Sequence, residues 1–127
     1  MESLPLTAQF EQKLKELKAL QAGVQKHYVN REQIMTQLNE NEGVLKEFGL
    51  LEGDAQIFKL VGPVLVKQDL DDSKANVEKR ITYIKGQLED VEKLIKEGEE
   101  TVGKKQEEAA ALQNKYNEQQ AQAQQAA

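Results

Sequence analysis

The sequence is poor in the residue types on which disulfide frameworks, compact cores and many active sites depend. It contains no cysteine, which excludes disulfides and cysteine-ligated metal sites. It contains no tryptophan, and aromatic residues make up only 5% of the chain, which is little for a compact globular core. Its one histidine, His27, has no evident partner to orient it, as a catalytic histidine requires. We therefore expect His27 to lie on a helix surface or in a helix seam.

Segments that would direct the chain to or across a membrane are also missing. No stretch approaches 18 consecutive apolar residues, so no transmembrane helix is predicted. The first residues, Met1–Thr7, lack the basic and apolar regions of a signal peptide. We expect a soluble protein of the cytoplasm with no membrane partner.

The sequence motifs of common enzymes are absent. The chain has no Gly-rich phosphate loop, no nucleophile elbow and no His-Glu-x-x-His pattern. Asp69, Asp71 and Asp72 could be a metal cluster, but their spacing matches no calcium loop, and helix capping explains them better. We predict a protein that is not an enzyme and that uses no cofactor or metal.

No long segment of the chain carries charges of only one sign. The chain carries 17 basic and 22 acidic residues, for a net charge of −5. Residues 8–48 hold six basic and six acidic groups, and residues 71–118 hold nine and twelve. Because neither segment has a basic stripe, the sequence argues against a nucleic-acid partner.

Two long segments of helical periodicity make up most of the chain. The first is predicted over residues 8–51, where two neighbouring stripes compete for the seam. One stripe is Phe10, Leu14, Leu17, Gln21, Val24, Tyr28, Arg31, Met35, Leu38, Glu42 and Leu45. The other is Leu20, His27, Ile34, Asn41 and Phe48. The spacing predicts a helix but leaves its register open.

The second segment is predicted over residues 72–118 and has an uninterrupted four-three spacing. Its seam is Val77, Ile81, Ile84, Leu88, Val91, Ile95, Gly98, Val102, Lys105, Ala109, Leu112 and Tyr116. Asp71, Asp72 and Ser73 supply acceptors and negative charge where the helix should begin. Residues 119–127 contain only Gln and Ala, and we expect this tail to fray because it has little to pack.

A short β-prone segment, residues 56–68, lies between the two helices and is apolar on both faces. Because Pro63 fits poorly at the second corner of an ordinary tight turn, either the loop is longer than two residues or Pro63 opens the second strand, and we expect the latter. Fully burying each apolar side chain stabilises by roughly 1.5–3 kcal/mol, and two helices cannot cover both faces of a hairpin. We therefore predict that other chains cover the hairpin. The apolar residues are Ile57, Phe58, Leu60, Val61, Val64, Leu65 and Val66.

The hairpin predicts that the two helices pair antiparallel, as one domain of residues 1–127 with both termini at the far end. That arrangement brings Leu4, Leu6 and Phe10 near Leu112 and Tyr116. Two helices alone cannot cover these side chains. The side chains therefore belong either to frayed helix ends or to an exposed hydrophobic surface that binds another protein.

Glycines form a second feature with two interpretations. Gly23 is expected to lie across from the segment that begins at Gly98 and ends at Gly103. Because each Gly costs about 1 kcal/mol relative to Ala in a helix interior, the cluster indicates either a soft joint or neutral drift on a tolerant helix.

The central segment resembles the β-class subunits of the prefoldin family. The resemblance rests on Ile-Phe-Lys-Leu-Val-Gly-Pro-Val-Leu-Val-Lys-Gln-Asp-Leu at residues 57–70 and on the stretches that flank it. Gln-Leu-Asn-Glu-Asn at 37–41 and Glu-Phe-Gly-Leu-Leu at 47–51 precede it, and Ala-Asn-Val-Glu-Lys-Arg-Ile at 75–81 follows. The layout matches over residues 8–118, and the outer helix halves match only as heptads.

This resemblance implies a fold and a function. Prefoldin is a heterohexameric co-chaperone of α- and β-class subunits, whose hairpins join into a β-barrel platform that carries coiled-coil arms. The arm ends hold unfolded clients, notably actin and tubulin, and pass them to the cytosolic chaperonin without ATP. The seven apolar hairpin residues would belong to the platform. Client contacts would fall, by position, near Leu4, Leu6, Phe10, Leu14, Leu112 and Tyr116.

A different class of protein also fits the helices. A coiled-coil adaptor of the cytoskeleton or of vesicle traffic would show the same periodicity. It would give no reason for a hairpin that is apolar on both faces. A helical arm of an RNA-binding enzyme is disfavoured by the mixed charge, and a holdase acting alone would leave an aggregation-prone hairpin uncovered.

Overall fold

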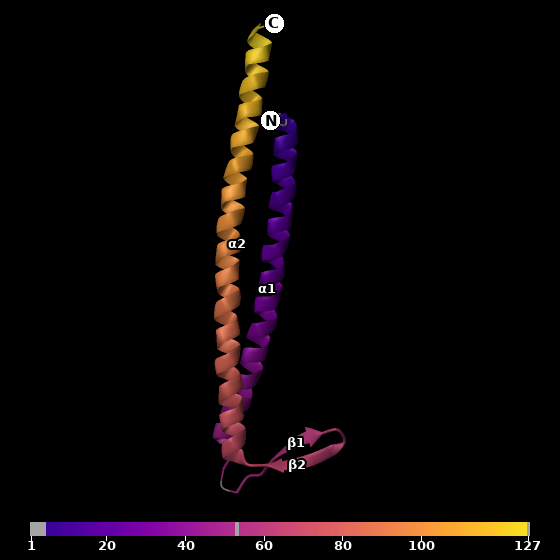
Figure 1. The fold of residues 1–127 in the computed structure, drawn as a ribbon. Coiled ribbons are helices and arrows are strands. Elements are labelled where there is room, and N and C mark those ends of the chain that lie inside the picture. Colours follow the sequence, from indigo (N-terminus) through magenta and orange to yellow (C-terminus); the bar gives the residue numbers. More distant parts are fainter. Residues whose placement is uncertain (1–4, 53, 127) are drawn as a thin grey trace. The chain divides into compact units, whose positions relative to one another are not determined.

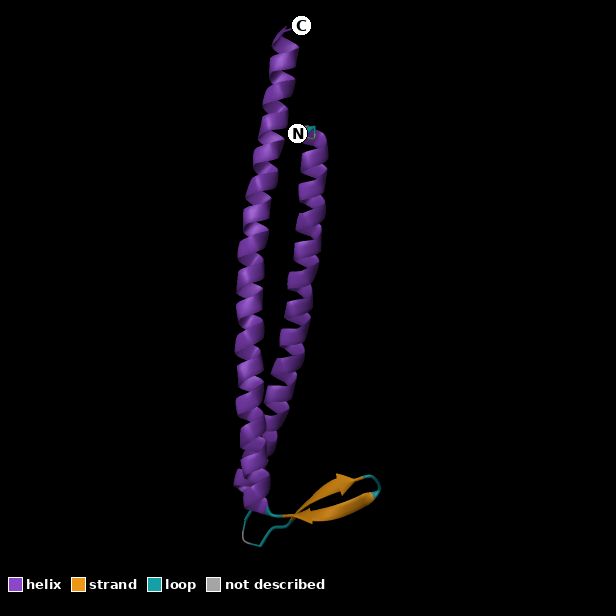
Figure 2. Cartoon of the chain, in the orientation of Figure 1, coloured by secondary structure: helices purple, strands orange, loops and turns teal. Residues whose placement is uncertain are grey.

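Two long helices flank a two-stranded hairpin (Figures 1 and 2). The computed structural model describes residues 5–52 and 54–126. Helix α1 is Leu6–Leu50, strand β1 is Ile57–Val61, strand β2 is Val64–Gln68, and helix α2 is Leu70–Ala126. The predicted helix–hairpin–helix order and the central antiparallel hairpin are confirmed.

Helix α2 begins two residues earlier than predicted, because its cap is Asp69. The Asp69 carboxylate oxygen Oδ1 accepts a hydrogen bond of 2.9 Å from the backbone N–H of Asp72. Asp71 and Asp72 therefore lie within the first turn, where their negative charge favours the positive end of the helix dipole.

Helix α2 also ends later than predicted. The periodic pattern predicted an end at Glu118, whereas α2 continues to Ala126 with all of its last residues exposed. Gln and Ala are good helix formers, and no Gly or Pro follows Gly103 to end the helix. Residues 119–126 are therefore helical without tertiary packing.

The hairpin closes through a two-residue turn. Val61 pairs with Val64, so Gly62 and Pro63 form the turn, and the expectation that Pro63 opens the second strand is wrong. Gly62 has a φ of +59°, while Pro63 is not among the described residues with positive φ. A positive φ followed by a negative one is the pattern of a type II′ turn, whose second corner accepts the fixed φ of proline.

By its contacts the chain divides into two units, and both helices contribute to each. The hairpin unit is residues 30–91, and the terminal unit is residues 1–29 together with 92–127. In the hairpin unit, α1 and α2 enclose a core against which Leu45, Phe48 and Leu88 pack. The buried core residues are Ile34, Leu38, Val77, Ile81, Ile84 and Val91.

Burial along α1 settles the register that the sequence left open. The seam takes the whole second stripe and seven members of the first, while Leu14, Gln21, Tyr28 and Glu42 are exposed. The buried and half-buried positions of the two stripes are Phe10, Leu17, Leu20, Val24, His27, Arg31, Ile34, Met35, Leu38, Asn41, Leu45 and Phe48. The seam predicted for α2 is confirmed, since all twelve of its positions are buried or half-buried.

Candidate interaction surfaces

The hairpin surface consists of the seven apolar residues that the sequence singled out. Six of them are exposed, and the cross-strand pair Leu60 and Leu65 is 66% and 65% exposed. Ile57 alone is half-buried. Side chains of this kind rarely stand in water as a continuous group without a binding role.

The strand register assigns these side chains to two faces. Phe58, Leu60 and Leu65 share one face, because paired residues point the same way and neighbours alternate. Ile57, Val61, Val64 and Val66 share the other face. Within the described part of the chain the sheet has two strands only, so each strand also has an unpaired edge. The hairpin can therefore bind another chain through either face and through either edge.

The tip surface lies in the terminal unit, where the first turns of α1 meet α2. Leu6, Phe10 and Tyr116 line one hollow of about 200 Å³, as the antiparallel pairing predicted. Leu112 lines an adjacent groove, also bordered by Lys13 and Glu108. The structure thus brings four of the predicted residues to one end of the unit.

Two predicted tip residues are not part of these hollows. Leu14 is 43% exposed but lines neither of them, because it lies outside the seam. Leu4 lies outside the described residues.

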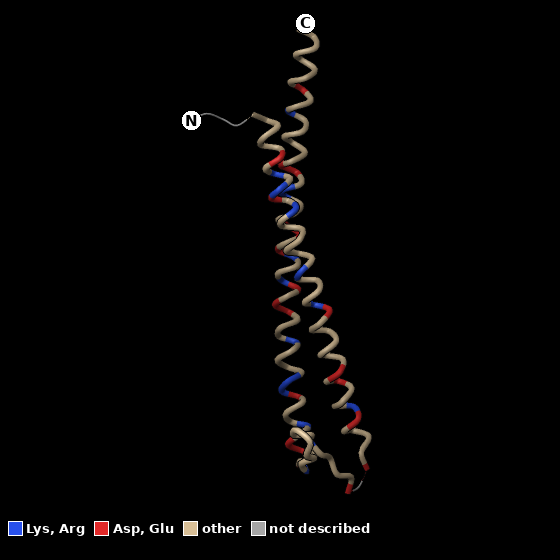
Figure 3. The backbone as a smooth tube through the Cα atoms, turned by 90° about the vertical axis from the view of Figure 1, so that its right-hand side faces the viewer, with Lys and Arg blue, Asp and Glu red and all other residues tan. Residues whose placement is uncertain are grey.

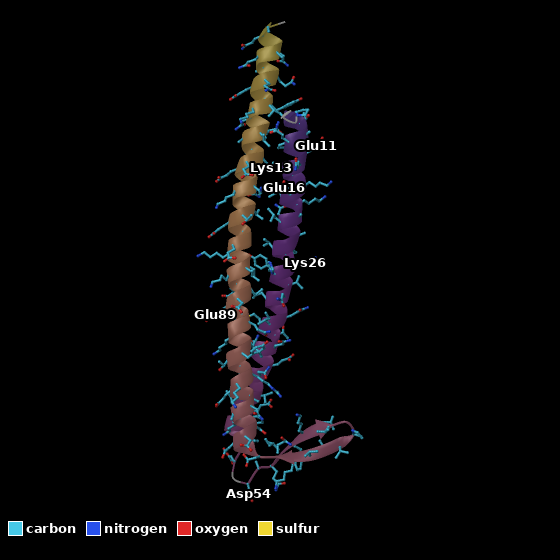
Figure 4. The ribbon with its side chains drawn as sticks, viewed as in Figure 1. Glu11, Lys13, Glu16, Lys26, Asp54 and Glu89 are labelled. Atoms are coloured by element: carbon cyan, nitrogen blue, oxygen red, sulfur yellow. The ribbon has the colours of Figure 1, made fainter. Side chains whose placement is uncertain are left out.

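A cluster of four charged side chains joins the helices next to the tip (Figure 4 labels Lys13 and Glu16). Lys13 Nζ lies 3.0 Å from Glu108 Oε2, and Lys105 Nζ lies 3.2 Å from Glu16 Oε2. Pairs within each helix, at 3.5 and 3.7 Å, close the cluster. Glu16 Oε2 is buried, and its ion pair with Lys105 does not have the geometry of a hydrogen bond. These cross-pairs show that the helices run antiparallel in this unit.

The sequence pattern did not predict this cluster. It placed Lys105 in the apolar seam of the second helix without naming a partner for it. Lys105 was the signal available in the sequence, because a charged residue at a seam position needs an opposite charge from the facing helix.

The cluster gives a pH-dependent contribution to stability. The hydrogen bond from Lys13 lowers the pKa of Glu108 below its usual 4.5, and the same bond raises the pKa of Lys13 above 10.5. The Glu108 contribution is therefore present above pH 4.5 and is lost as the pH falls through the lowered pKa. The Lys13 contribution is present below pH 10.5 and is lost as the pH rises through the raised pKa.

We expect Glu108→Gln to weaken the dependence of thermal stability on acidic pH. The measurement is the melting temperature between about pH 3 and pH 7, compared with the control Glu107→Gln on the same helix. The charge of Glu107 forms none of the ion pairs found in the described chain. Equal pH profiles for the two variants would contradict the role of the cluster.

Farther along the terminal unit, the helices approach each other closely at Gly98. A Cβ placed on Gly98 would lie 2.7 Å from Val24 Cγ2, whereas Gly103 has nothing within 4 Å. The Tyr28 hydroxyl donates a hydrogen bond to Glu99 at the same level. Gly98 therefore permits close packing, while the soft joint stays a prediction.

We expect Gly98→Ala to destabilise the chain by about 1–3 kcal/mol, because the stiff Val24 side chain cannot easily turn aside. Gly103→Ala should instead stabilise it by up to about 1 kcal/mol, since it adds helix propensity in open space. Thermal unfolding of both variants measures the difference. In a Val24→Ala background, Gly98→Ala should lose most of its cost, and an unchanged cost would rule out the contact.

Charges of both signs alternate along the two helices (Figure 3). No group of three or more His, Asp or Glu in the described chain could hold a metal ion. Among the described residues, no helix combines the length and apolarity that a membrane crossing requires.

Comparisons with known proteins agree with this architecture. The family model described as prefoldin subunit matches residues 11–123. Prefoldin subunit 6 of Arabidopsis thaliana is 43% identical over 110 residues, which cover 87% of this chain and 85% of that protein. Prefoldin subunit 6 of Homo sapiens is 37% identical over 102 residues, covering 80% and 79%.

A solved structure shows the same fold. The crystal structure of the prefoldin beta subunit from Thermococcus strain KS-1 superposes with a TM-score of 0.78 at 25% identity, covering 88% of this chain and 97% of that chain. With two long helices, a central antiparallel hairpin and a family match over most of its length, the chain belongs to the prefoldin subunit family and is a co-chaperone subunit.

Proposed function

We propose that this chain assembles through its hairpin into a heterohexameric prefoldin of the cytoplasm, together with other α- and β-class subunits. In this assembly the tip surface captures unfolded clients such as actin and tubulin and delivers them to the cytosolic chaperonin. The observation that carries the proposal is the exposed hairpin, which presents six apolar side chains to solvent within a family of chaperone subunits.

Exposure of the hairpin supports assembly on energetic grounds. Burial of each large apolar side chain contributes roughly 1.5–3 kcal/mol, and both faces and both edges of the hairpin are available. A partner strand would satisfy the unpaired backbone groups of an edge as well as covering a face. The hairpins of several subunits could thus close into the proposed β-barrel platform, which leaves no edge exposed.

The tip surface supports weak and reversible capture. Leu6, Phe10 and Tyr116 are half-buried around a shallow hollow, so one chain offers only a small apolar contact. Several such contacts in one assembly gain from effective concentration, which allows tight capture from individually weak sites. Leu4 and Leu14 would extend this surface. Capture and release by this route need no ATP, and the sequence has no Gly-rich phosphate loop.

The tip assignment is tested by the triple variant Phe10→Ser, Leu112→Ser and Tyr116→Ser in the assembled complex. We expect a several-fold loss in suppression of the aggregation of an unfolded client, because the apolar contact of this subunit is removed. The complex itself should keep its size, since these residues lie in the terminal unit.

A matched control replaces three exposed apolar residues of the helices that lie outside the tip surface. Val29→Ser, Tyr83→Ser and Leu94→Ser remove side chains that are at least as exposed. Client suppression should stay normal in this control. Equal suppression by the tip variant and wild type would refute the tip assignment.

A further inference from the structure

A groove of about 230 Å³ runs between the base of the hairpin and the adjacent ends of both helices, within the hairpin unit. Val44 and Phe48 of α1, Val77 of α2 and both Ile57 and Phe58 of β1 form its apolar lining. The groove is thus continuous with the hairpin face that carries Ile57, Val61, Val64 and Val66.

Two cations also line this groove, Lys59 from the hairpin and Arg80 from α2. Lys59 lies on the same hairpin face as Ile57, since strand neighbours alternate. Within the described part of the chain, neither Lys59 nor Arg80 takes part in any of the ion pairs or side-chain hydrogen bonds. Both side chains are exposed, so their donor groups are open to water.

Covering this face would remove that water. A lysine or arginine that loses its hydration inside an interface weakens binding unless an opposite charge replaces the water. The groove therefore favours a partner surface with a particular kind of side chain. An occupant with only apolar side chains would be penalised, and an occupant with a correctly placed carboxylate would be favoured.

We propose that the groove receives an acidic segment of a neighbouring prefoldin subunit, in which an Asp or Glu pairs with Arg80 and Lys59 while apolar neighbours fill the space above Phe48 and Ile57. This inference rests on the proposed assembly function and names the chemistry of its partner. The planar guanidinium of Arg80 can bind a carboxylate in a bidentate manner, which selects the partner by geometry as well as by charge.

The first experiment reconstitutes the full complex with charge-removing variants that keep an apolar stem, Lys59→Met and Arg80→Met. If a partner carboxylate lies in the groove, each single variant removes one of its two cations and weakens binding, and the double variant leaves it unpaired, so that the affinity for partner subunits falls at least about 30-fold. If no carboxylate is present, removing a poorly paired cation tightens the complex or leaves it unchanged, and either result overturns the proposal.

One control matches these variants closely. Lys79 is the neighbour of Arg80 on α2 but does not line the groove. Lys79→Met should change the affinity by less than about twofold, as exposed charges usually do. Losses equal to those of the groove variants would overturn the proposal, because they would reflect net charge alone.

The second experiment identifies the occupant. A photo-crosslinking amino acid replaces Asn76, which is exposed and lines the groove, and the assembled complex is irradiated and analysed by mass spectrometry. The expected product joins this chain to an Asp- or Glu-containing peptide of a different subunit. Products confined to this chain, to a second copy of it or to a client would overturn the proposal.

Failure of this inference is distinguishable from failure of the proposed function. If the complex forms and the Lys59 and Arg80 variants bind as wild type does, only the acidic occupant is refuted. If the wild-type chain forms no complex with other prefoldin subunits, both the acidic occupant and the assembly function are refuted.

Discussion

Replacing Leu60 and Leu65 together by serine is expected to abolish stable association with other prefoldin subunits. The two leucines form a cross-strand pair on one face of the hairpin and are the most exposed of its apolar side chains. If each contributes roughly 1.5–3 kcal/mol when buried, the double variant loses about 3–6 kcal/mol per interface. That loss corresponds to a fall in affinity of about 100-fold to 10,000-fold.

Size-exclusion chromatography with light scattering measures this result, using the variant mixed with its partner subunits. The helical signal in circular dichroism should stay unchanged, because neither leucine belongs to the helix core. The control Val29→Ser with Leu94→Ser removes exposed apolar side chains from the helices and should assemble normally. A hexamer of normal size and stability from the hairpin variant would contradict the proposed assembly.

Replacing Ile84 by alanine is expected to destabilise the chain strongly. Ile84 is 6% exposed and belongs to the buried core of the hairpin unit. Its truncation removes apolar burial and leaves a cavity between α1 and α2, at a cost of about 2–5 kcal/mol. For a chain of this size the melting temperature should fall by about 10 °C or more.

The matched control is Leu94→Ala on the same helix, whose side chain is 47% exposed. Its truncation removes little buried area, so we expect a change within about 0.5 kcal/mol. Thermal unfolding followed by circular dichroism compares the two. Similar melting temperatures would show that the seam of α2 does not supply the packing energy.

Much of the architecture could be predicted because it depends on local patterns. The seam of α2 from Val77 to Tyr116 follows the period of an α-helix, and every predicted position is buried or half-buried. The alternation of Phe58 and Leu60 against Ile57 and Val61 predicted a hairpin with two apolar faces. Both patterns repeat within a few residues, so they can be recognised in a short stretch of sequence.

Other features could not be predicted because they depend on the facing helix. Both stripes of α1 contribute to the seam, since Ile34 of one stripe and Leu38 of the other are buried in the core that α1 and α2 enclose. Gly98 and Gly103 look alike in sequence, and only the structure places Val24 Cγ2 2.7 Å from a Cβ at position 98. The pairing of Lys13 with Glu108 likewise joins residues far apart in the chain.

The sequence by itself determined the order of helix, hairpin and helix and the apolar residues of the hairpin, because periodicity is written in neighbouring residues, and the resemblance of residues 57–70 and their flanks indicated the family. Only the tertiary structure decided which positions of the two α1 stripes are buried, how Gly98 packs, and that Lys59 and Arg80 share one groove with Ile57. The physical reason is that contacts across two helices depend on their relative register, to which residues distant in the sequence contribute jointly.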